Sequence, residues 1–350
     1  MSLRPAGLLA LLALAACARG MPPAASAPTL DALFAPPTPA EIAEVEAEWA
    51  GRDTGVHGFR VESTRRDGAT GRTLVVSHTV GGVRHFGAVR VPDGAGPGKL
   101  PVLVVLHGGD AGATGYRFNH SGPLAREWIQ VLPSLRGEPL WLSPLRRYRS
   151  AGSPSPWDRD VDDAMALLSA VLAHVPEADS ARVAAVGESR GGGVALLMGI
   201  RDPRVKAVVD YVGPTDFLLP EVRALALRAV SSRIPRLPGA GFLADSVLFA
   251  LRDGRTTVRR ARLELIRRSP VYFAHRLPPT QAHYGARDRK VAVAHGDRLN
   301  AAVARRDTAA WQYHRYPTGR HRVSSLAGAR ARAAAFLSRV AGTHPSSRVP

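Results

Sequence analysis

One apolar run and the pentapeptide after it constrain the fold of this chain more than any other feature. Residues 182–186 have the apolar character of a buried strand and lead into Gly-Glu-Ser-Arg-Gly at positions 187–191. Small and apolar residues follow and favour a helix. A tight turn from a strand into a helix leaves no room for a Cβ atom at either glycine. The pattern G-x-S-x-G therefore predicts an elbow that lifts Ser189 above the edge of a sheet.

Two later loops supply the partners that such a serine needs. A serine hydroxyl is a poor nucleophile near neutral pH unless a base accepts its proton and a carboxylate orients that base. His321 follows the last expected strand in a glycine-containing loop, and Asp288 follows the strand before it, with Gly285 at the turn. We predict Ser189 as the nucleophile, His321 as the base and Asp288 as the acid.

Other residues remain alternatives for the base and the acid. His314 lies within the last strand pattern, where it would face a packed surface, and His295 lies in an expected helix. Asp297 and Asp307 fall on a helix or at its end, where a solvated position is the usual explanation.

Backbone N–H groups near the serine are candidates for an oxyanion hole, which stabilises negative charge on the substrate oxygen. The N–H of Arg190 directly follows the nucleophile. The segment His-Gly-Gly-Asp at 107–110 follows a buried strand, and its glycines allow close approach of the backbone. We predict Gly109 as the second donor and expect a structural role for His107.

Strands and helices alternate along most of the chain. Residues 72–79 and 83–91 alternate apolar and polar side chains around two glycines, which predicts an antiparallel hairpin. Further strands are expected at 100–106, 128–133, 182–186, 205–212, 281–284 and 311–316, and helices at 161–175, 291–305 and 323–340. This order predicts an α/β fold with a mixed, mostly parallel sheet and helices on both faces.

Together these motifs resemble the α/β-hydrolase superfamily, and within it the catalytic domain of the prolyl oligopeptidase (S9) family of serine peptidases. The resemblance spans roughly residues 70–342 and is carried by the segments 107–109, 187–191, 269–274, 284–288 and 316–321. It implies an α/β-hydrolase domain at 41–342 whose catalytic residues follow the order serine, acid, histidine.

The superfamily inserts a cap over the active site, and residues 217–275 fit that description. They lack a sheet pattern and carry apolar residues at helical spacing in 222–230, 242–251 and 258–266. The arginines of the cap include Arg223, Arg228, Arg233 and Arg236. A solvated helix face is the favoured explanation for them, and recognition of an acidic substrate group is the alternative. The basic stretch 259–268 could lie against anionic lipid.

The N-terminus indicates export. A basic start precedes an apolar stretch at 7–16, much shorter than the ~20 residues that span a bilayer. It ends in Leu-Ala-Ala-Cys at 14–17, which resembles the lipobox of bacterial lipoproteins. We predict a signal peptide at 1–17, lipidation of Cys17 and a membrane-anchored protein of the bacterial cell envelope. An ordinary secretory signal, giving a soluble secreted or periplasmic protein, is the alternative.

Low-complexity segments flank the expected domain. Residues 18–40 are rich in Pro and Ala and predict an extended tether, and residues 343–350 form a tail. Thr-Pro-Ala-Glu at 38–41 matches a capping box and predicts the start of a helix.

Composition narrows the functional classes. The net charge is +18, but all except three of the 47 basic residues are arginines and they are dispersed, so no nucleic-acid partner is predicted. The single cysteine excludes an intramolecular disulfide. No metal-ligand spacing or dinucleotide-binding glycine motif occurs, and we predict no cofactor.

The sequence thus predicts an exported serine hydrolase that acts on a small molecule or a peptide through an acyl-enzyme. An S9-like serine peptidase is the first interpretation, and a carboxylesterase for small or sugar-linked esters is the alternative. A non-catalytic envelope lipoprotein that binds a ligand is a more remote alternative. The oligomeric state is left open.

Overall fold

The computed structural model describes residues 27–68, 70–115, 124, 126–143, 145–231, 239–304, 310–340 and 342. The predicted signal peptide, the lipidation site Cys17 and the tail at 343–350 lie outside the described residues. The same holds for Arg233, Arg236 and Asp307.

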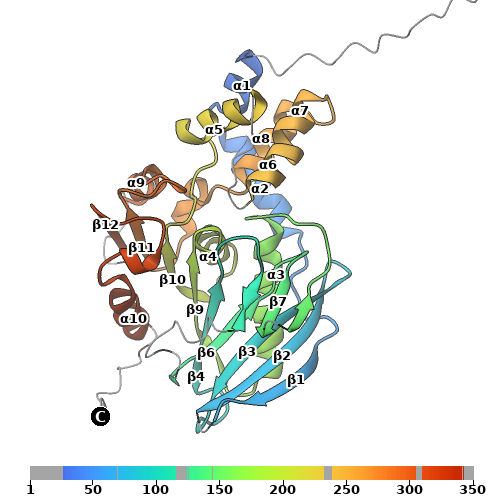
Figure 1. The fold of residues 1–350 in the computed structure, drawn as a ribbon, viewed down its shortest axis with the longest axis vertical. Coiled ribbons are helices and arrows are strands. Elements are labelled where there is room, and N and C mark those ends of the chain that lie inside the picture. Colours follow the sequence, from blue (N-terminus) through green and yellow to red (C-terminus); the bar gives the residue numbers. More distant parts are fainter. Residues whose placement is uncertain are drawn as a thin grey trace, which may run out of the picture.

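A nine-stranded sheet forms the centre of the molecule (Figure 1). Its strands lie in the order β1-β2-β3-β6-β4-β9-β10-β11-β12. All neighbours from β6 to β12 pair in parallel, whereas the pairs β1–β2, β2–β3 and β3–β6 are antiparallel. The strands are β1 (Arg60–Arg66), β2 (Gly71–Val80), β3 (Val83–Pro92), β4 (Leu100–Leu106), β6 (Ile129–Pro133), β9 (Ala178–Glu188), β10 (Val205–Tyr211), β11 (Thr280–Gly285) and β12 (Trp311–Tyr316). The predicted hairpin and the mostly parallel sheet are confirmed.

Helices cover both faces of this sheet. The strand β4 shows how its sequence matches burial on both faces. Val102 of β4 belongs to the core formed with α3 (Arg159–His174) and α4 (Arg190–Arg201). Leu103 belongs to a second core on the other face, formed with α10 (Ala329–Val340). A strand that is buried on both sides needs a continuous apolar run, which is what residues 100–106 provide.

Some elements differ from the sequence prediction. The strand β1 and a small second sheet of β5 (Ala113–Thr114), β7 (Pro139–Ser143) and β8 (Arg146–Arg149) were not predicted. The helix expected at 291–305 is the shorter α9 (Ala294–Val303). The helix expected at 323–340 starts with the short 3₁₀ turn η5 (Val323–Ser325), and α10 follows only after Gly328, which has a left-handed φ of 73°.

The predicted helical insertion lies above the carboxyl ends of the parallel strands (Figure 1). Its elements are α5 (Pro220–Ser231), α6 (Ala240–Leu243), the π-helical segment η2 (Ala244–Phe249), α7 (Ala250–Arg252) and α8 (Val258–Ile266). The 3₁₀ helix η3 (Pro270–Arg276) then leads back to β11. We refer to α5–α8 as the cap.

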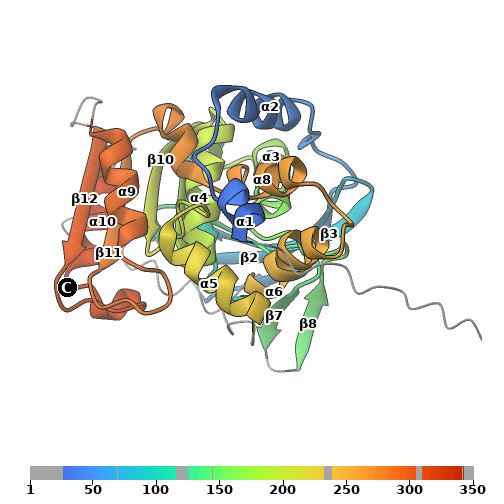
Figure 2. The same ribbon diagram turned by 90° about the horizontal axis from the view of Figure 1, so that it is seen from above.

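The N-terminal segment corrects one expectation. Residues 27–33 form the helix α1 (Ala27–Leu33) and are not extended, so the extended tether predicted at 18–40 is wrong for these residues. Leu30 and Leu33 are buried, and α1 packs on α8 of the cap (Figure 2). The next helix, α2 (Pro39–Ala50), starts with the predicted capping box, in which Glu41 bonds back to the residue before the helix.

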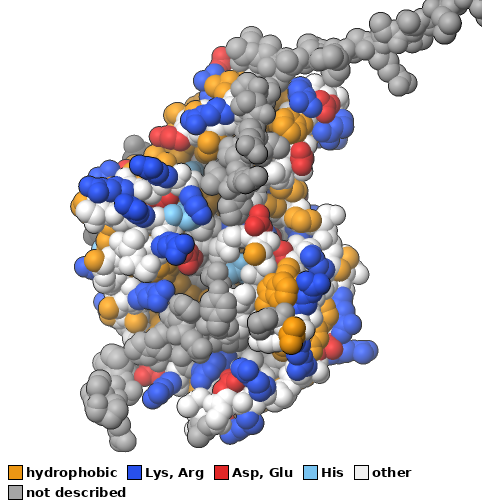
Figure 3. All heavy atoms as spheres, in the orientation of Figure 1, with side chains coloured by type: hydrophobic (Ala, Val, Ile, Leu, Met, Phe, Trp, Pro, Cys, Tyr) orange, Lys and Arg blue, Asp and Glu red, His pale blue; other side chains and the backbone are white. Residues whose placement is uncertain are grey.

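Arginines of the cap hold this N-terminal segment in place. Arg262 donates to the carbonyl oxygens of Ala32 and Ala35, both at 2.8 Å, and to the carboxylate of Glu41 at 2.6 Å. Arg267 also reaches Glu48 of α2 at 2.7 Å. Within the stretch 259–268, Arg262 and Arg267 therefore bind the N-terminal segment of the same chain. Elsewhere, Lys and Arg side chains are scattered over the face in Figure 3.

Candidate active site

The elbow forms as predicted between β9 and α4. Ser189 adopts φ 56° and ψ −120°, a conformation that residues other than glycine rarely take. Its N–H donates to the carbonyl oxygen of Tyr211 on the neighbouring strand at 2.8 Å. A Cβ atom on Gly187 would lie 1.9 Å from the carbonyl oxygen of Gly191, and one on Gly191 would lie 2.2 Å from that of Leu106. The two glycines are therefore sterically required.

The structure brings the three predicted side chains into one hydrogen-bonded chain. His321 Nδ1 lies 2.7 Å from Asp288 Oδ2, and His321 Nε2 lies 2.9 Å from Ser189 Oγ. Because a carboxylate only accepts hydrogen bonds, Nδ1 carries the proton in the neutral ring. Nε2 then accepts the hydrogen bond that the Ser189 hydroxyl donates.

Adjacent parallel strands position the two partners of Ser189. β11 precedes the loop of Asp288, β12 precedes the loop of His321, and the two strands pair in register up to their last residues. The Asp288 side chain is fully buried, and its Oδ1 accepts the N–H groups of Lys290 at 2.8 Å and Val291 at 3.1 Å. These bonds fix the carboxylate that faces His321.

The alternative residues lie elsewhere. His314 is in β12 and stacks on His283 with ring centroids 4.9 Å apart. Asp297 accepts the hydroxyl of Tyr313 at 2.7 Å. His295 is not bonded to Ser189 and instead accepts two backbone N–H groups.

The predicted oxyanion loop packs directly against Ser189. A Cβ atom on Gly108 would lie 2.8 Å from the carbonyl oxygen of Glu188 and 3.1 Å from the Cβ of Ser189. Gly109 has a φ of 80°, which favours glycine at this position. The loop at 107–110 thus lies directly beside Ser189.

The side chain of Arg190 forms a buried network that the sequence did not reveal. It is 2 % exposed, and its Nε and Nη2 atoms each donate to Asp160 at 2.8 Å. Its Nη1 donates to Glu138 and, at 3.2 Å, to the carbonyl oxygen of Gly109. Burial opposes the charge, but the carboxylates of Asp160 and Glu138 more than offset it and raise the pKa of Arg190. Arg190 therefore ties the loop at 107–110 to the protein core.

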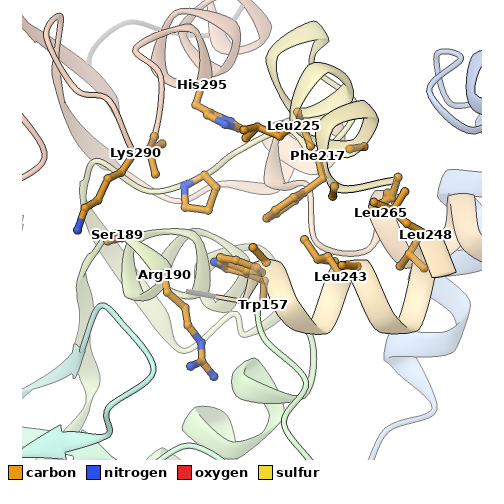
Figure 4. Close-up of a pocket in the computed structure, with 18 of the residues that line it drawn as sticks. Trp157, Ser189, Arg190, Phe217, Leu225, Leu243, Leu248, Leu265, Lys290 and His295 are labelled. Atoms are coloured by element: carbon orange, nitrogen blue, oxygen red, sulfur yellow. The ribbon is translucent and has the colours of Figure 1, made fainter. Parts of the chain in front are cut away.

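A pocket of about 140 Å³ extends from Ser189 and His321 under the cap (Figure 4). Its lining is mostly apolar and comes from the cap, the sheet loops and the N-terminal segment. The apolar members are Phe34, Trp157, Pro214, Phe217, Val222, Leu225, Ala226, Ala229, Ala240, Leu243, Ala244, Val247, Leu248, Leu265 and Val291. Besides Ser189 and His321, the polar members are Arg190, Lys290 and His295. None of the described lining residues is an Asp or Glu.

The described part of the chain lacks two further features. Among the described residues, no group of three or more His, Cys, Asp or Glu side chains is placed to hold a metal ion. No described helix is both long and apolar enough to cross a membrane.

Comparisons with known proteins establish the fold. The sequence matches no family model and no curated protein. Acetyl xylan esterase 1 from Thermoanaerobacterium sp. JW/SL YS485 superposes with a TM-score of 0.64 at 18% identity, over 89% of this chain and 98% of that one. An acetyl xylan esterase from Paenibacillus sp. R4 gives a TM-score of 0.61 at 16% identity, over 88% and 98%.

A third solved structure shares the fold over part of its length. A puromycin-hydrolyzing peptidase of Mycobacterium tuberculosis gives a TM-score of 0.53 at 18% identity, over 80% of this chain and 47% of the peptidase. The central sheet, its covering helices and these likenesses together define an α/β-hydrolase fold.

Proposed function

We propose that this protein is a serine carboxylesterase. Ser189 attacks the ester carbonyl, His321 transfers the protons and Asp288 orients His321. The observation that carries the proposal is the hydrogen-bonded chain of these three side chains at the end of an apolar pocket. Such a chain gives the serine a base in the required tautomer.

The reaction follows from this arrangement. The Oγ atom of Ser189 bonds to the carbonyl carbon while His321 Nε2 takes its proton, and the carbonyl electron pair moves to oxygen. The N–H groups of Gly109 and Arg190 stabilise that oxyanion. When the intermediate collapses, the alcohol leaves with the proton from His321. Water then attacks the acyl-enzyme by the same route and releases the acid and free Ser189.

The pocket favours an ester over a peptide with a free N-terminus. Such a peptide carries an ammonium group, which requires a carboxylate partner when it is desolvated. The described lining offers none, and Lys290 adds a positive charge. The match to acetyl xylan esterase 1 also extends over almost the whole length of that esterase. The match to the puromycin-hydrolyzing peptidase covers only about half of that peptidase.

An S9-like serine peptidase is the second candidate, because the puromycin-hydrolyzing peptidase shares the fold over most of this chain. Peptide and ester cleavage use the same three side chains. The substrate, and not the triad, therefore separates the two.

We expect the purified protein to react with a fluorophosphonate and to cleave p-nitrophenyl esters faster than aminoacyl or dipeptidyl p-nitroanilides. Each methylene buried in the pocket contributes ~0.8 kcal/mol. The value of kcat/KM should therefore rise about fourfold per methylene as one arm of the ester, its acyl chain or its alcohol chain, is lengthened from two to six carbons. Steady-state kinetics on both panels measure this. Faster cleavage of the anilides would favour the peptidase, and a folded protein that does not react with the probe would favour a ligand-binding role.

We also propose that the chain is exported and anchored to the membrane through a lipid on Cys17. The support is the sequence at 7–17 alone. We expect the wild-type protein to fractionate with membranes, and Cys17→Ser to remain unprocessed by the lipoprotein pathway and to lose the lipid mass from its N-terminus. Fractionation and intact-mass spectrometry measure this. A Cys17→Ser protein with the wild-type mass shift and location would exclude the anchor.

A further inference from the structure

One polar side chain on the pocket wall has no role in the proposed proton transfers. His295 of α9 is only 6 % exposed and lines the same pocket as Ser189. Its Nδ1 atom accepts the N–H groups of Thr215 at 3.1 Å and Asp216 at 3.3 Å. The hydroxyl of Thr215 also donates to the carbonyl oxygen of His295 at 2.6 Å. The ring is therefore held in one orientation by a loop about 80 residues earlier in the sequence.

These contacts determine where the ring carries its proton. A nitrogen that accepts hydrogen bonds is unprotonated, so the neutral ring of His295 carries hydrogen on Nε2. Burial lowers the pKa of His295 to about 4, which keeps the ring neutral near pH 7. Among the described residues, Nε2 has no hydrogen-bond partner. His295 thus offers the pocket a fixed donor and no acceptor.

The apolar side chains around this N–H donor make the pocket selective for substrates that carry a hydrogen-bond acceptor. Figure 4 shows His295 and Leu225 on one side of the pocket and Trp157 and Leu243 on the other. Phe217 lies between them. A purely apolar substrate arm would displace water from the N–H without replacing its hydrogen bond, which weakens binding. An arm with an acceptor oxygen at the same depth would restore that bond.

We infer that His295 is a specificity-determining residue whose Nε2–H donates a hydrogen bond to an acceptor oxygen on the apolar arm of the substrate. The preferred substrates are then esters with an ether, hydroxyl or carbonyl oxygen within that arm. This inference rests on the proposed esterase function and adds the substrate class to it.

The test replaces single methylenes by ether oxygen, which accepts hydrogen bonds and hardly changes the shape of the chain. One series consists of p-nitrophenyl hexanoate and its analogues with oxygen at chain position 3, 4 or 5. A second series places the same six-atom arm on the alcohol side, as hexyl acetate and its ether analogues. A pocket of about 140 Å³ is close to the ~150 Å³ of a cavity that holds benzene, so an arm of six heavy atoms fits.

For the wild-type protein we expect one ether analogue to have a KM about tenfold below that of its all-carbon parent, since a matched hydrogen bond replaces an unpaired donor. The effect falls on KM because the contact exists before and during the reaction. In His295→Asn this advantage should disappear. The asparagine oxygen can still accept from Thr215 and Asp216, but no donor remains at the position of Nε2.

Leu225→Ala is the matched control, because it removes apolar contact from the same wall without touching a hydrogen bond. It should raise the KM of parent and analogue alike and leave their ratio unchanged. Equal KM values across both wild-type series would overturn the inference even if His295→Asn failed to fold. An unchanged ratio in a folded His295→Asn would also overturn it. Cleavage of the parents without ether preference removes only this inference, whereas no cleavage of any ester removes the esterase as well.

Discussion

Ser189→Ala and His321→Ala are each expected to lower kcat by about 10⁴- to 10⁶-fold, because each removes one member of a unit that transfers a proton and forms a covalent bond. The double variant should be no slower than the worse single variant, since neither residue works without the other. Stopped assays with the fastest p-nitrophenyl ester measure this. A double variant that is slower by the product of the two single effects would contradict a shared mechanism.

His314→Ala is the matched control for the base. His314 lies in β12, the strand that precedes the loop of His321. Its ring packs on His283 and does not reach Ser189. We expect its kcat to stay within about threefold of wild type, because residues outside the reacting unit do not share its large effects. A fall comparable to that of His321→Ala would show that the base had been assigned to the wrong ring.

The sequence was sufficient to predict the elbow and the arrangement of Ser189, His321 and Asp288, because their constraints are local or follow from strand order. The clash of a Cβ on Gly187 or Gly191 with nearby backbone is a property of the turn itself. Asp288 and His321 each follow a strand, and consecutive parallel strands place their carboxyl ends at one edge of the sheet. The elbow and the two loops that follow these strands were therefore enough to predict how the three side chains meet.

Features that depend on distant contacts could not be predicted. The segment before residue 38 has the composition of a linker, yet Arg262 of the cap supplies donors for its carbonyl groups and Phe34 joins the pocket wall. The neutral tautomer of His295 is likewise set by Thr215, far away in the sequence. For Arg190, the glycine-rich motif indicates a backbone role but says nothing of its buried carboxylate partners.

Arg190→Met is expected to reduce both stability and catalysis. Loss of the guanidinium leaves Asp160 and Glu138 buried without their partner, and breaking a buried ion pair from one side costs ~3–5 kcal/mol of unfolding free energy. The carbonyl of Gly109 also loses a donor at 3.2 Å, so the oxyanion loop is less well positioned. One lost oxyanion donor lowers kcat by about 10²- to 10³-fold, and a displaced donor should cost about 10- to 100-fold. Chemical denaturation and steady-state kinetics measure the two effects.

Arg201→Met separates these two effects. Arg201 lies at the other end of α4, is similarly buried and pairs with Asp162, but it does not touch the oxyanion loop. We expect a smaller loss of unfolding free energy than in Arg190→Met, because Asp162 keeps Arg52 and Arg159 as partners. We expect kcat to stay within about threefold of wild type, because the donors of the oxyanion loop stay in place. KM should change little in Arg190→Met, since the oxyanion forms only during the reaction. If both variants lowered kcat equally, Arg190 would act on stability alone and another contact would have to position the loop of Gly109.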